Sequence, residues 1–313
     1  MEQMVILGSG PAGLSAAIYG GRAQLSPLLI TGTALGGQAA TTSEIENYPG
    51  FPKGVGGMEL TQLMQEQAER FGTRVEMDEV TEVALGAQPF VVKTYGATYE
   101  TRTLIVATGV SPRLLGVPGE EKFKGRGVSW CATCDGFFYK DKVVAVLGGG
   151  DAAVEEAIFL TRFAQKVYVV HRRTQLRAQK VAQERARQNA KIECICDSVV
   201  VEILGEENVD GVRLRNVLTN QESELQVDGV FSYIGTIPNS QLFVRQLELD
   251  PRGYVVTDRR MRTNVPGVFA AGDVQEIAWR QVSTAVGSGA IAAMEAEKYI
   301  AEQESHADPE RQW

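Results

Sequence analysis

The segment GVSWCATCDGFF, residues 127–138, contains two cysteines three positions apart, Cys131 and Cys134, followed directly by Asp135. Such a pair can bind a metal, form a structural disulfide or carry electrons as a dithiol. Zinc would normally need two more cysteine or histidine ligands, and the chain offers only a C-x-C pair and two isolated histidines. Four clustered cysteines are too few to staple 313 residues in the manner of a secreted protein. The pattern therefore favours a redox-active pair and no metal site.

A glycine-rich turn near the N-terminus predicts a dinucleotide-binding unit. The sequence MVILGSGPAGLSAAI runs an apolar strand into Gly8, Gly10 and Gly13 and then into an amphipathic helix. The first glycine of this motif makes the tight turn, the second lets the backbone approach a pyrophosphate, and the third lets helix and strand pack closely. The helix N-terminus also attracts the phosphate charge. The spacing alone is weak evidence, but its place between a strand and a helix strengthens it.

The same pattern recurs 140 residues later. In KVVAVLGGGDAAVEEAIFL, Gly148 and Gly150 take the first two glycine positions and Ala153 takes the third. The next strand ends at His171, again 140 residues after Thr31, which ends the matching strand of the first unit. The repeat predicts two Rossmann-like dinucleotide-binding units.

Arginines after the second turn indicate which nucleotide binds there. An NAD site usually has an acidic residue about 20 positions after the glycines. The segment HRRTQLRA instead supplies Arg172, Arg173 and Arg177, whose guanidinium groups suit a 2′-phosphate. A basic surface helix continuing through residues 180–187 is the alternative interpretation. We expect NADPH at the second unit.

The first unit has Thr31 where an acid would hold the ribose, so this position does not identify its nucleotide. The segments TLIVATG (103–109) and VFAAGD (268–273) each end an apolar strand in small residues, as expected beside a bulky cofactor. A nicotinamide cannot easily reduce a disulfide directly, whereas a flavin accepts hydride and passes electrons to sulfur. We therefore expect FAD in the first unit.

Together with GGQ (36–38), ENYPG (46–50) and GVFAAGDV (267–274), these segments resemble the low-molecular-weight thioredoxin reductases from about Val5 to Ile300. The resemblance implies an α/β fold of two Rossmann-like domains of the three-layer ββα type, one inserted in the other. The FAD-binding domain would comprise residues 1–112 and 246–313, and the NADPH-binding domain, residues 113–245, would carry the disulfide. It also implies a homodimer. Joins rich in Pro and Gly would act as hinges, because the dithiol must meet first the flavin and then thioredoxin.

The resemblance also implies the site residues. FAD contacts fall on Gly8, Gly10, Gly13, Gln38, Asn47, Asp273, Arg280 and Gln281, and NADPH contacts fall on Gly148, Gly150, Arg172, Arg173 and Arg177. Cys131 would exchange with thioredoxin and Cys134 would face the flavin. Asp135 is our candidate proton donor, because the departing sulfur must be protonated, and a role in the turn with Gly136 is compatible with this.

Other residues near these motifs have less specific interpretations. Phe137 and Phe138 are expected in the core. Cys194 and Cys196 lie two apart in a β-like run, so they would share one face as packed or half-exposed thiols.

The polar tail ESHADPERQW is longer than this family leads us to expect and ends in Trp313. The tail either frays or places the Trp313 indole on the flavin, where nicotinamide would otherwise dock. A covered flavin would suit a one-electron donor, so ferredoxin, docking on the same basic residues, is the alternative to NADPH. A dithiol oxidase would not need the arginines, and an intact cysteine pair with two nucleotide units argues against a non-catalytic redox sensor.

The composition limits the partners. A net charge of −8 without a long basic run argues against binding to nucleic acid or to an anionic membrane. The N-terminus lacks a secretory pattern and the chain has no run of 18 apolar residues, which predicts a cytoplasmic protein. The expected activity is thioredoxin reduction by NADPH through FAD and the cysteine pair.

Overall fold

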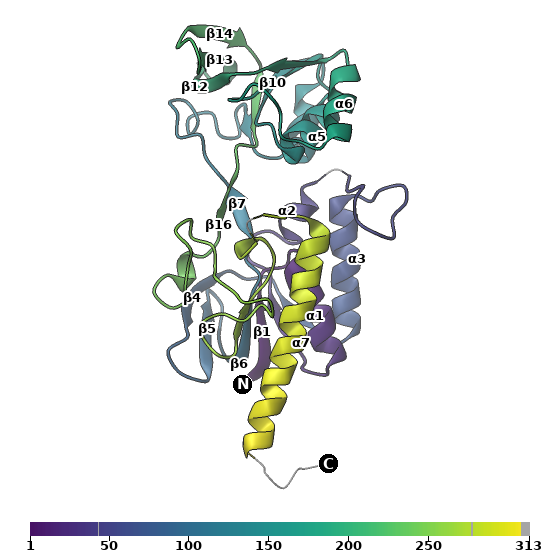
Figure 1. Ribbon diagram of the computed structural model, residues 1–313, viewed down its shortest axis with the longest axis vertical. Helices are drawn as coiled ribbons and strands as arrows, with labels where there is room; N and C mark the ends of the chain where they lie inside the picture. Colours follow the sequence, from purple (N-terminus) through teal and green to yellow (C-terminus); the bar gives the residue numbers. More distant parts are fainter. Residues whose placement is uncertain (43, 277, 308–313) are drawn as a thin grey trace. The chain divides into compact units, whose positions relative to one another are not determined.

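The computed structural model describes residues 1–42, 44–276 and 278–307. The chain divides into two compact units, the first formed by Met1–Ser111 with Ile237–Trp313 and the second by Pro112–Thr236. The segments in which the chain crosses between the units include β7 (Val110–Pro112) and β16 (Thr236–Pro238), which pair with each other (Figure 1). The second division falls between Thr236 and Ile237, and Phe243 is fully buried in the core of the first unit.

The first unit is built on one mixed sheet with the strand order β3-β2-β1-β6-β5-β4, and β17 also pairs with β6. The parallel strands are β1 (Glu2–Leu7), β2 (Leu28–Ile30), β3 (Arg74–Glu76), β6 (Thr98–Val106) and β17 (Val268–Ala270). The strands β4 (Val80–Ala84) and β5 (Phe90–Thr94) continue the sheet in antiparallel order. The long strand β6 therefore belongs to both parts of the sheet.

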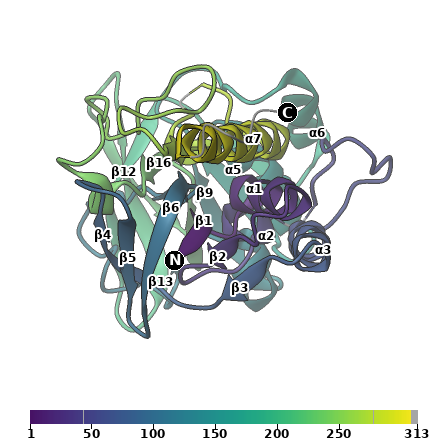
Figure 2. The same cartoon turned by 90° about the horizontal axis from the view of Figure 1, so that it is seen from below.

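Strand β1 is apolar at every position from Met4 to Leu7 because both of its faces are covered. Met4 and Ile6 pack on one face with helices α1 (Pro11–Arg22), α3 (Gly57–Arg70) and α7 (Val282–Ala307), which lie together in Figure 2. Val5 and Leu7 pack on the other face, against residues that include Phe243 of the short 3-10 helix η2 (Gln241–Phe243). This layering fixes the turn after β1 at the carboxyl edge of a buried sheet.

The second unit repeats this plan with a parallel sheet in the order β11-β10-β9-β15-β8. Its strands are β11 (Ile192–Ile195), β10 (Lys166–Val170), β9 (Val143–Leu147), β15 (Gly229–Ser232) and β8 (Val128–Ser129). The helices α5 (Asp151–Leu160) and α6 (Lys180–Gln188) and the antiparallel strands β12 (Ser198–Gly205), β13 (Val209–Asn216) and β14 (Glu222–Gln226) complete the unit.

Strand β9 shows how the layers of the second unit are arranged. Val144 and Val146 share a core with Ala153 and Ala157 of α5, whereas Ala145 and Leu147 share another with residues of β12 and β13. A helix layer, a parallel sheet and a smaller antiparallel sheet thus form three layers. The α/β class with two Rossmann-like units, one inserted in the other, is confirmed.

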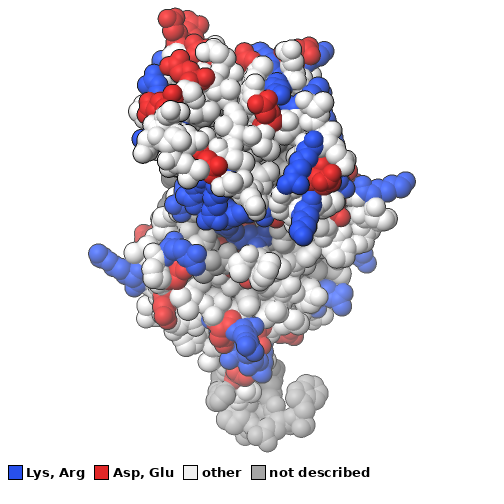
Figure 3. Space-filling view, turned by 45° about the horizontal axis from the view of Figure 1, so that its top comes forward, with Lys and Arg blue, Asp and Glu red and all other residues white. Residues whose placement is uncertain are grey.

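The surface carries charges of both signs. Both Lys and Arg side chains and Asp and Glu side chains appear on the face shown in Figure 3. Every helix in the described part of the chain is too short or too polar to span a bilayer.

Helices α1 and α7 approach closely because α7 has a glycine at the contact. A Cβ atom at the buried Gly289 would lie 2.1 Å from the carbonyl oxygen of Ala12, whereas the exposed Gly287, in the same helix, has no atom of the described chain within 4 Å of its Cβ position. The Ser15 hydroxyl also donates to the Val286 carbonyl, at 2.8 Å. The position of the glycine therefore sets the spacing of the two helices.

We expect Gly289→Ala to destabilise the protein by about 1–3 kcal/mol, because the methyl group forces α7 away from α1. The matched variant Gly287→Ala should stabilise it by about 0.5–1 kcal/mol, because alanine favours the helix. Thermal unfolding followed by circular dichroism measures both. Equal shifts in the two variants would contradict the packing described here.

Candidate functional site

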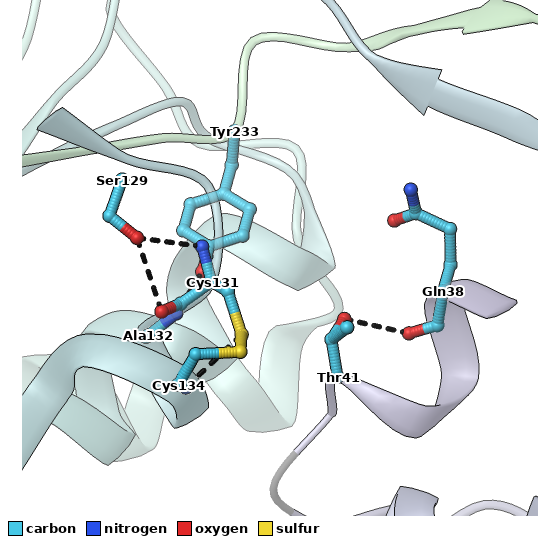
Figure 4. Close-up of a disulfide and its surroundings, with 7 residues drawn as sticks. All are labelled: Gln38, Thr41, Ser129, Cys131, Ala132, Cys134 and Tyr233. Atoms are coloured by element: carbon cyan, nitrogen blue, oxygen red, sulfur yellow. Dashed lines mark hydrogen bonds between the residues drawn. A yellow bond between two sulfur atoms is a disulfide. The ribbon is translucent and has the colours of Figure 1, made fainter. Parts of the chain in front are cut away.

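The cysteine pair sits at the start of the short helix α4 (Ala132–Asp135), where Cys131 and Cys134 form a disulfide (Figure 4). The Cys134 backbone N–H donates to the Cys131 sulfur at 3.1 Å. The Ser129 hydroxyl donates to the Cys131 carbonyl at 3.2 Å and accepts the Cys131 N–H at 3.0 Å. Hydrogen bonds therefore hold Cys131 at its N–H, its carbonyl and its sulfur.

Helix α4, which we call the redox helix, is exposed on one side and packed against the protein on the other. Cys134 is exposed and Cys131 is partly buried, whereas Ala132 is fully buried. At the following Gly136 a Cβ atom would lie 3.2 Å from a methyl carbon of Leu160, so this segment packs tightly on α5. A hydrogen bond to sulfur stabilises a thiolate, so after reduction Cys131 is the better placed of the two sulfurs to act as a nucleophile.

Phe137 and Phe138 do not enter the core, and that prediction was wrong. Their exposed fractions are 67% and 70%. They belong to the 3-10 helix η1 (Gly136–Tyr139), in which residues three apart share a face. Gly136 and Tyr139 take the buried face, so the two phenylalanines between them point outward. An apolar surface consequently lies directly after the disulfide in the chain.

Two residues behind the disulfide, Glu156 and Tyr233, were not identified from the sequence. The Tyr233 hydroxyl accepts the Ala132 N–H at 2.9 Å (Figure 4). Glu156 of α5 is only 8% exposed, and burial, reinforced by the neighbouring Glu155, raises its pKa to about 7. Burial also raises the pKa of Tyr233, and the Glu156 carboxylate adds to this rise. The helix on which the redox helix packs thus carries a buried acid with a raised pKa.

The first glycine turn has the geometry that a bound pyrophosphate requires. Gly8 has φ of +107°, and a Cβ atom there would lie 2.3 Å from the Ala107 carbonyl oxygen. A Cβ atom at Gly13 would lie 1.8 Å from the Gly8 carbonyl oxygen, which explains the close contact of helix and strand. The Cβ position of Gly10 has no atom of the described residues within 4 Å. The turn is therefore closed toward the protein and open at Gly10, where a ligand can approach.

Other expected FAD residues lie on several segments of the first unit. Asn47 donates to the Gln281 side chain at 2.9 Å, which joins residues 234 positions apart, and Gln38 donates to the Val110 carbonyl at 3.1 Å. Asp273 lies in the 3-10 helix η3 (Gly272–Val274), which contacts α1. Burial raises the pKa of Asp273 to about 6, although the charge of Arg280 opposes the rise. Hydrogen bonds and contacts thus join polar residues from both ends of the chain within the first unit.

The second turn brings together the expected NADPH residues. Gly148 has φ of +146°, and the Cβ position of Gly150, like that of Gly10, is free of atoms of the described chain within 4 Å. The segment after β10 folds over this turn, because the Arg177 N–H donates to the Gly149 carbonyl at 2.6 Å. Arg172, Arg173 and Arg177 are all exposed, and the described residues provide no ion-pair partner for them. Uncompensated guanidinium groups beside a glycine turn suit a phosphate.

The remaining candidates have less direct roles. Cys194 is exposed and Cys196 is partly buried, and burial raises the pKa of both thiols, which disfavours the reactive thiolate. Asp135 is partly buried at the end of α4. Trp313, the candidate for stacking on the flavin, lies outside the described residues.

Comparisons with known proteins agree on one family. The family model for pyridine nucleotide-disulphide oxidoreductases matches residues 2–289. A thioredoxin reductase of Mycolicibacterium smegmatis is 50% identical over 97% of this chain and 98% of its own length. A bifunctional thioredoxin reductase/thioredoxin of Mycobacterium leprae is 49% identical over 96% of this chain and 66% of its own, longer sequence. The solved thioredoxin reductase of Lactococcus lactis, in its FR conformation, matches with a TM-score of 0.94 and 43% identity over 96% of this chain and all of that one.

The buried Glu156 predicts a pH dependence of stability. Its pKa rises from an ordinary 4.5 to about 7, so the folded protein retains a proton that the unfolded chain releases between these values. Stability therefore falls as the pH rises from about 4.5 to about 7. Glu156→Gln should abolish this fall and make the protein more stable than wild type at pH 8 by about 3 kcal/mol, at 1.36 kcal/mol for each pKa unit.

Urea unfolding of both proteins at pH 5 and pH 8 measures the effect. Glu184→Gln, on the exposed side of α6, is the matched control and should follow wild type. If wild type is as stable as Glu156→Gln at pH 8, Glu156 does not titrate as described.

Proposed function

The chain belongs to the pyridine nucleotide-disulphide oxidoreductase family, and from this premise we propose that it is a thioredoxin reductase with FAD as its flavin and NADPH as its donor. The observation that carries the proposal is the disulfide on an exposed helix end within a chain that has two nucleotide-binding turns. The enzyme passes two electrons to the Cys131–Cys134 disulfide and from there to oxidised thioredoxin.

The cofactors follow from the two turns. FAD fits the first unit, where Gly10 is open and Asn47, Gln281 and Asp273 lie on elements around it, and when bound it would accept a hydride and deliver an electron pair to the disulfide. NADPH fits the second unit because exposed arginines supply the positive charge for a 2′-phosphate. A phosphate bound at either glycine turn would face the N-terminus of a helix, α1 or α5.

The thiol chemistry follows from the hydrogen bond at the redox helix. The Cys134 N–H stabilises the Cys131 thiolate, which attacks one sulfur of the thioredoxin disulfide and forms a mixed disulfide. Cys134 then attacks Cys131, the bond to thioredoxin breaks, and the two electrons leave with thioredoxin as two thiols. Asp135, next to Cys134, is placed to exchange protons with that sulfur.

Phe137 and Phe138 provide a docking surface for thioredoxin. Both side chains are mostly exposed and follow the disulfide directly, so a partner that contacts them also reaches the cysteine pair. Exposed aromatic side chains of this kind mark protein interaction sites. The fusion of a thioredoxin to the relative from Mycobacterium leprae is consistent with this partner.

The remaining features of the proposal concern movement and assembly. The paired crossing strands β7 and β16 would act as the hinge that lets one dithiol serve both flavin and thioredoxin. Tyr19, Leu63 and Met294 are exposed apolar residues on α1, α3 and α7, and they would suit a homodimer interface. A dithiol enzyme of this kind would work in the reducing cytoplasm.

Replacing either cysteine should abolish thioredoxin reduction while FAD stays bound and reducible. The two variants should differ in one respect, because only Cys131 attacks thioredoxin. The reagent is a thioredoxin with a single active-site cysteine that carries a thiol leaving group. Cys134→Ser should form a mixed disulfide with it, and Cys131→Ser should not. Gel mobility without reductant, with mass spectrometry of the adduct, distinguishes them, and an adduct formed only by Cys131→Ser would reverse the assigned roles.

Replacing Arg172 and Arg173 together by alanine should weaken NADPH binding by roughly 100-fold or more, because two charge-assisted contacts to the 2′-phosphate are lost. NADH, which lacks this phosphate, should bind as before. Anaerobic bleaching of the flavin absorbance measures both, with Arg187→Ala as the control on α6. If reduced ferredoxin bleaches the wild-type flavin and NADPH does not, the donor is ferredoxin and not NADPH.

A further inference from the structure

The second unit contains two buried polar groups that the reaction described above does not use, Glu156 and Ser232. Glu156 is 8% exposed and Ser232 is 2% exposed, and neither Glu156 Oε2 nor Ser232 Oγ has a hydrogen-bond partner within the described residues. Buried polar atoms are nearly always paired, so an unpaired carboxyl oxygen in this position calls for a function. Helix α4 packs on α5, the helix that carries Glu156.

Tyr233 holds the redox helix through one hydrogen bond, and the charge of Glu156 acts on its phenol. Its hydroxyl oxygen accepts the Ala132 N–H at 2.9 Å, one residue after Cys131. Among the groups that act on its phenol, the Glu156 carboxylate is the principal charged one, and Asp135 follows. Helix α4, which begins directly after Cys131, thus packs on the helix that carries Glu156 and is held by a tyrosine on which the charge of Glu156 acts.

Among the residues that the structure describes, none forms an ion pair with Glu156. Burial and Glu155 of the same helix are the influences on its proton affinity, and both favour the neutral form. The strand β9, which packs on α5, has no charged residue. The other elements packed on α5 carry the titratable residues Asp135 of α4, Lys166 and Tyr168 of β10, and Lys180, Glu184, Arg185 and Arg187 of α6. Lys166 is paired with Glu193, so it does not serve Glu156.

We propose that Glu156 is a positioning residue for redox chemistry, which takes up a proton when the Cys131–Cys134 disulfide is reduced and releases it when the dithiol is reoxidised. The inference rests on the proposed function only in that the disulfide must be redox-active. Its physical basis is that a new negative charge at the end of α4 raises the proton affinity of an acid buried behind that helix.

The step balances in electrons and protons. Two electrons break the sulfur–sulfur bond and leave Cys134 as a thiol and Cys131 as a thiolate. Of the two protons that accompany the electrons, Cys134 holds one and Glu156 holds the other. When thioredoxin takes the electron pair, both protons are released to the two new thiols of thioredoxin through solvent. When Glu156 is protonated, Cys131 can remain a thiolate without a second negative charge close to it.

The experiment measures how the disulfide equilibrates with dithiothreitol between pH 6 and pH 9. Wild type and the variants Glu156→Gln, Tyr233→Phe and Glu184→Gln are poised in mixtures of reduced and oxidised dithiothreitol, and the free thiols are alkylated. Mass spectrometry then counts alkylated Cys131 and Cys134. Flavin absorbance and circular dichroism establish that each variant is folded. Because each variant is compared with wild type at the same pH, the titration of dithiothreitol cancels.

The measured quantity is the equilibrium constant for reduction of the disulfide by dithiothreitol. We expect the ratio of this constant in wild type to that in Glu156→Gln to fall about tenfold as the pH rises from 6 to 9. Glu184→Gln should follow wild type at every pH. Tyr233→Phe should show a smaller change than wild type, because it removes the hydroxyl group that accepts the Ala132 N–H. A ratio of wild type to Glu156→Gln that is constant over this range would overturn the inference.

The assay contains neither thioredoxin nor NADPH, so its outcome is independent of the proposed function. A protein that shows the tenfold change but does not reduce thioredoxin would refute the function and support the coupling. A protein that reduces thioredoxin with a constant ratio would do the reverse.

Discussion

The close contact between Gly148 and Tyr233 joins the two active parts of the inserted unit. A Cβ atom at Gly148 would lie 2.5 Å from the Tyr233 carbonyl oxygen, so only glycine fits where β9 turns toward α5. The same Tyr233 supports the redox helix by accepting the Ala132 N–H. The turn that would cradle a nucleotide and the residue that anchors the disulfide are therefore in direct contact. A side chain at Gly148 would disturb both at once.

The redox helix combines two demands that oppose each other. A disulfide that exchanges with another protein must be accessible, and Cys134, Phe137 and Phe138 are exposed accordingly. A nucleophilic sulfur must also be held still, and the segment is too short to hold itself by helical hydrogen bonds. The position of the helix comes instead from the buried Ala132, from the contact of Gly136 with Leu160, and from the Ser129 hydrogen bonds. The buried contacts of the helix thus hold it in place, and its exposed side remains accessible to a partner.

The sequence predicts those features that depend on local spacing. The glycines at 8, 10 and 13, their repetition after 140 residues and the arginines after His171 identify two nucleotide units, because each motif encodes its own turn. It does not predict which face of a short 3-10 helix is buried, since two adjacent phenylalanines are equally apolar, and so Phe137 and Phe138 were assigned wrongly to the core. The importance of Tyr233 could not be predicted either, because it contacts Ala132 from 101 positions away. Glu156 did leave a signal, as it lies on the same helix face as Ala153 and Leu160.

The placement of Glu156 also explains why a carboxyl group can remain in a core that would be more stable without it. An ionised carboxylate among Ala153, Ala157 and Leu160 costs stability, and no arginine or lysine offsets that cost in the described structure. A residue that destabilises the fold yet sits behind the reactive atoms is more readily understood as part of the chemistry than of the architecture. In the proposed scheme the protons of the disulfide would be divided between Asp135, partly buried at the end of α4, and Glu156, buried on α5. Asp135 would then exchange protons with the adjacent sulfur, and Glu156 would respond to the charge on sulfur.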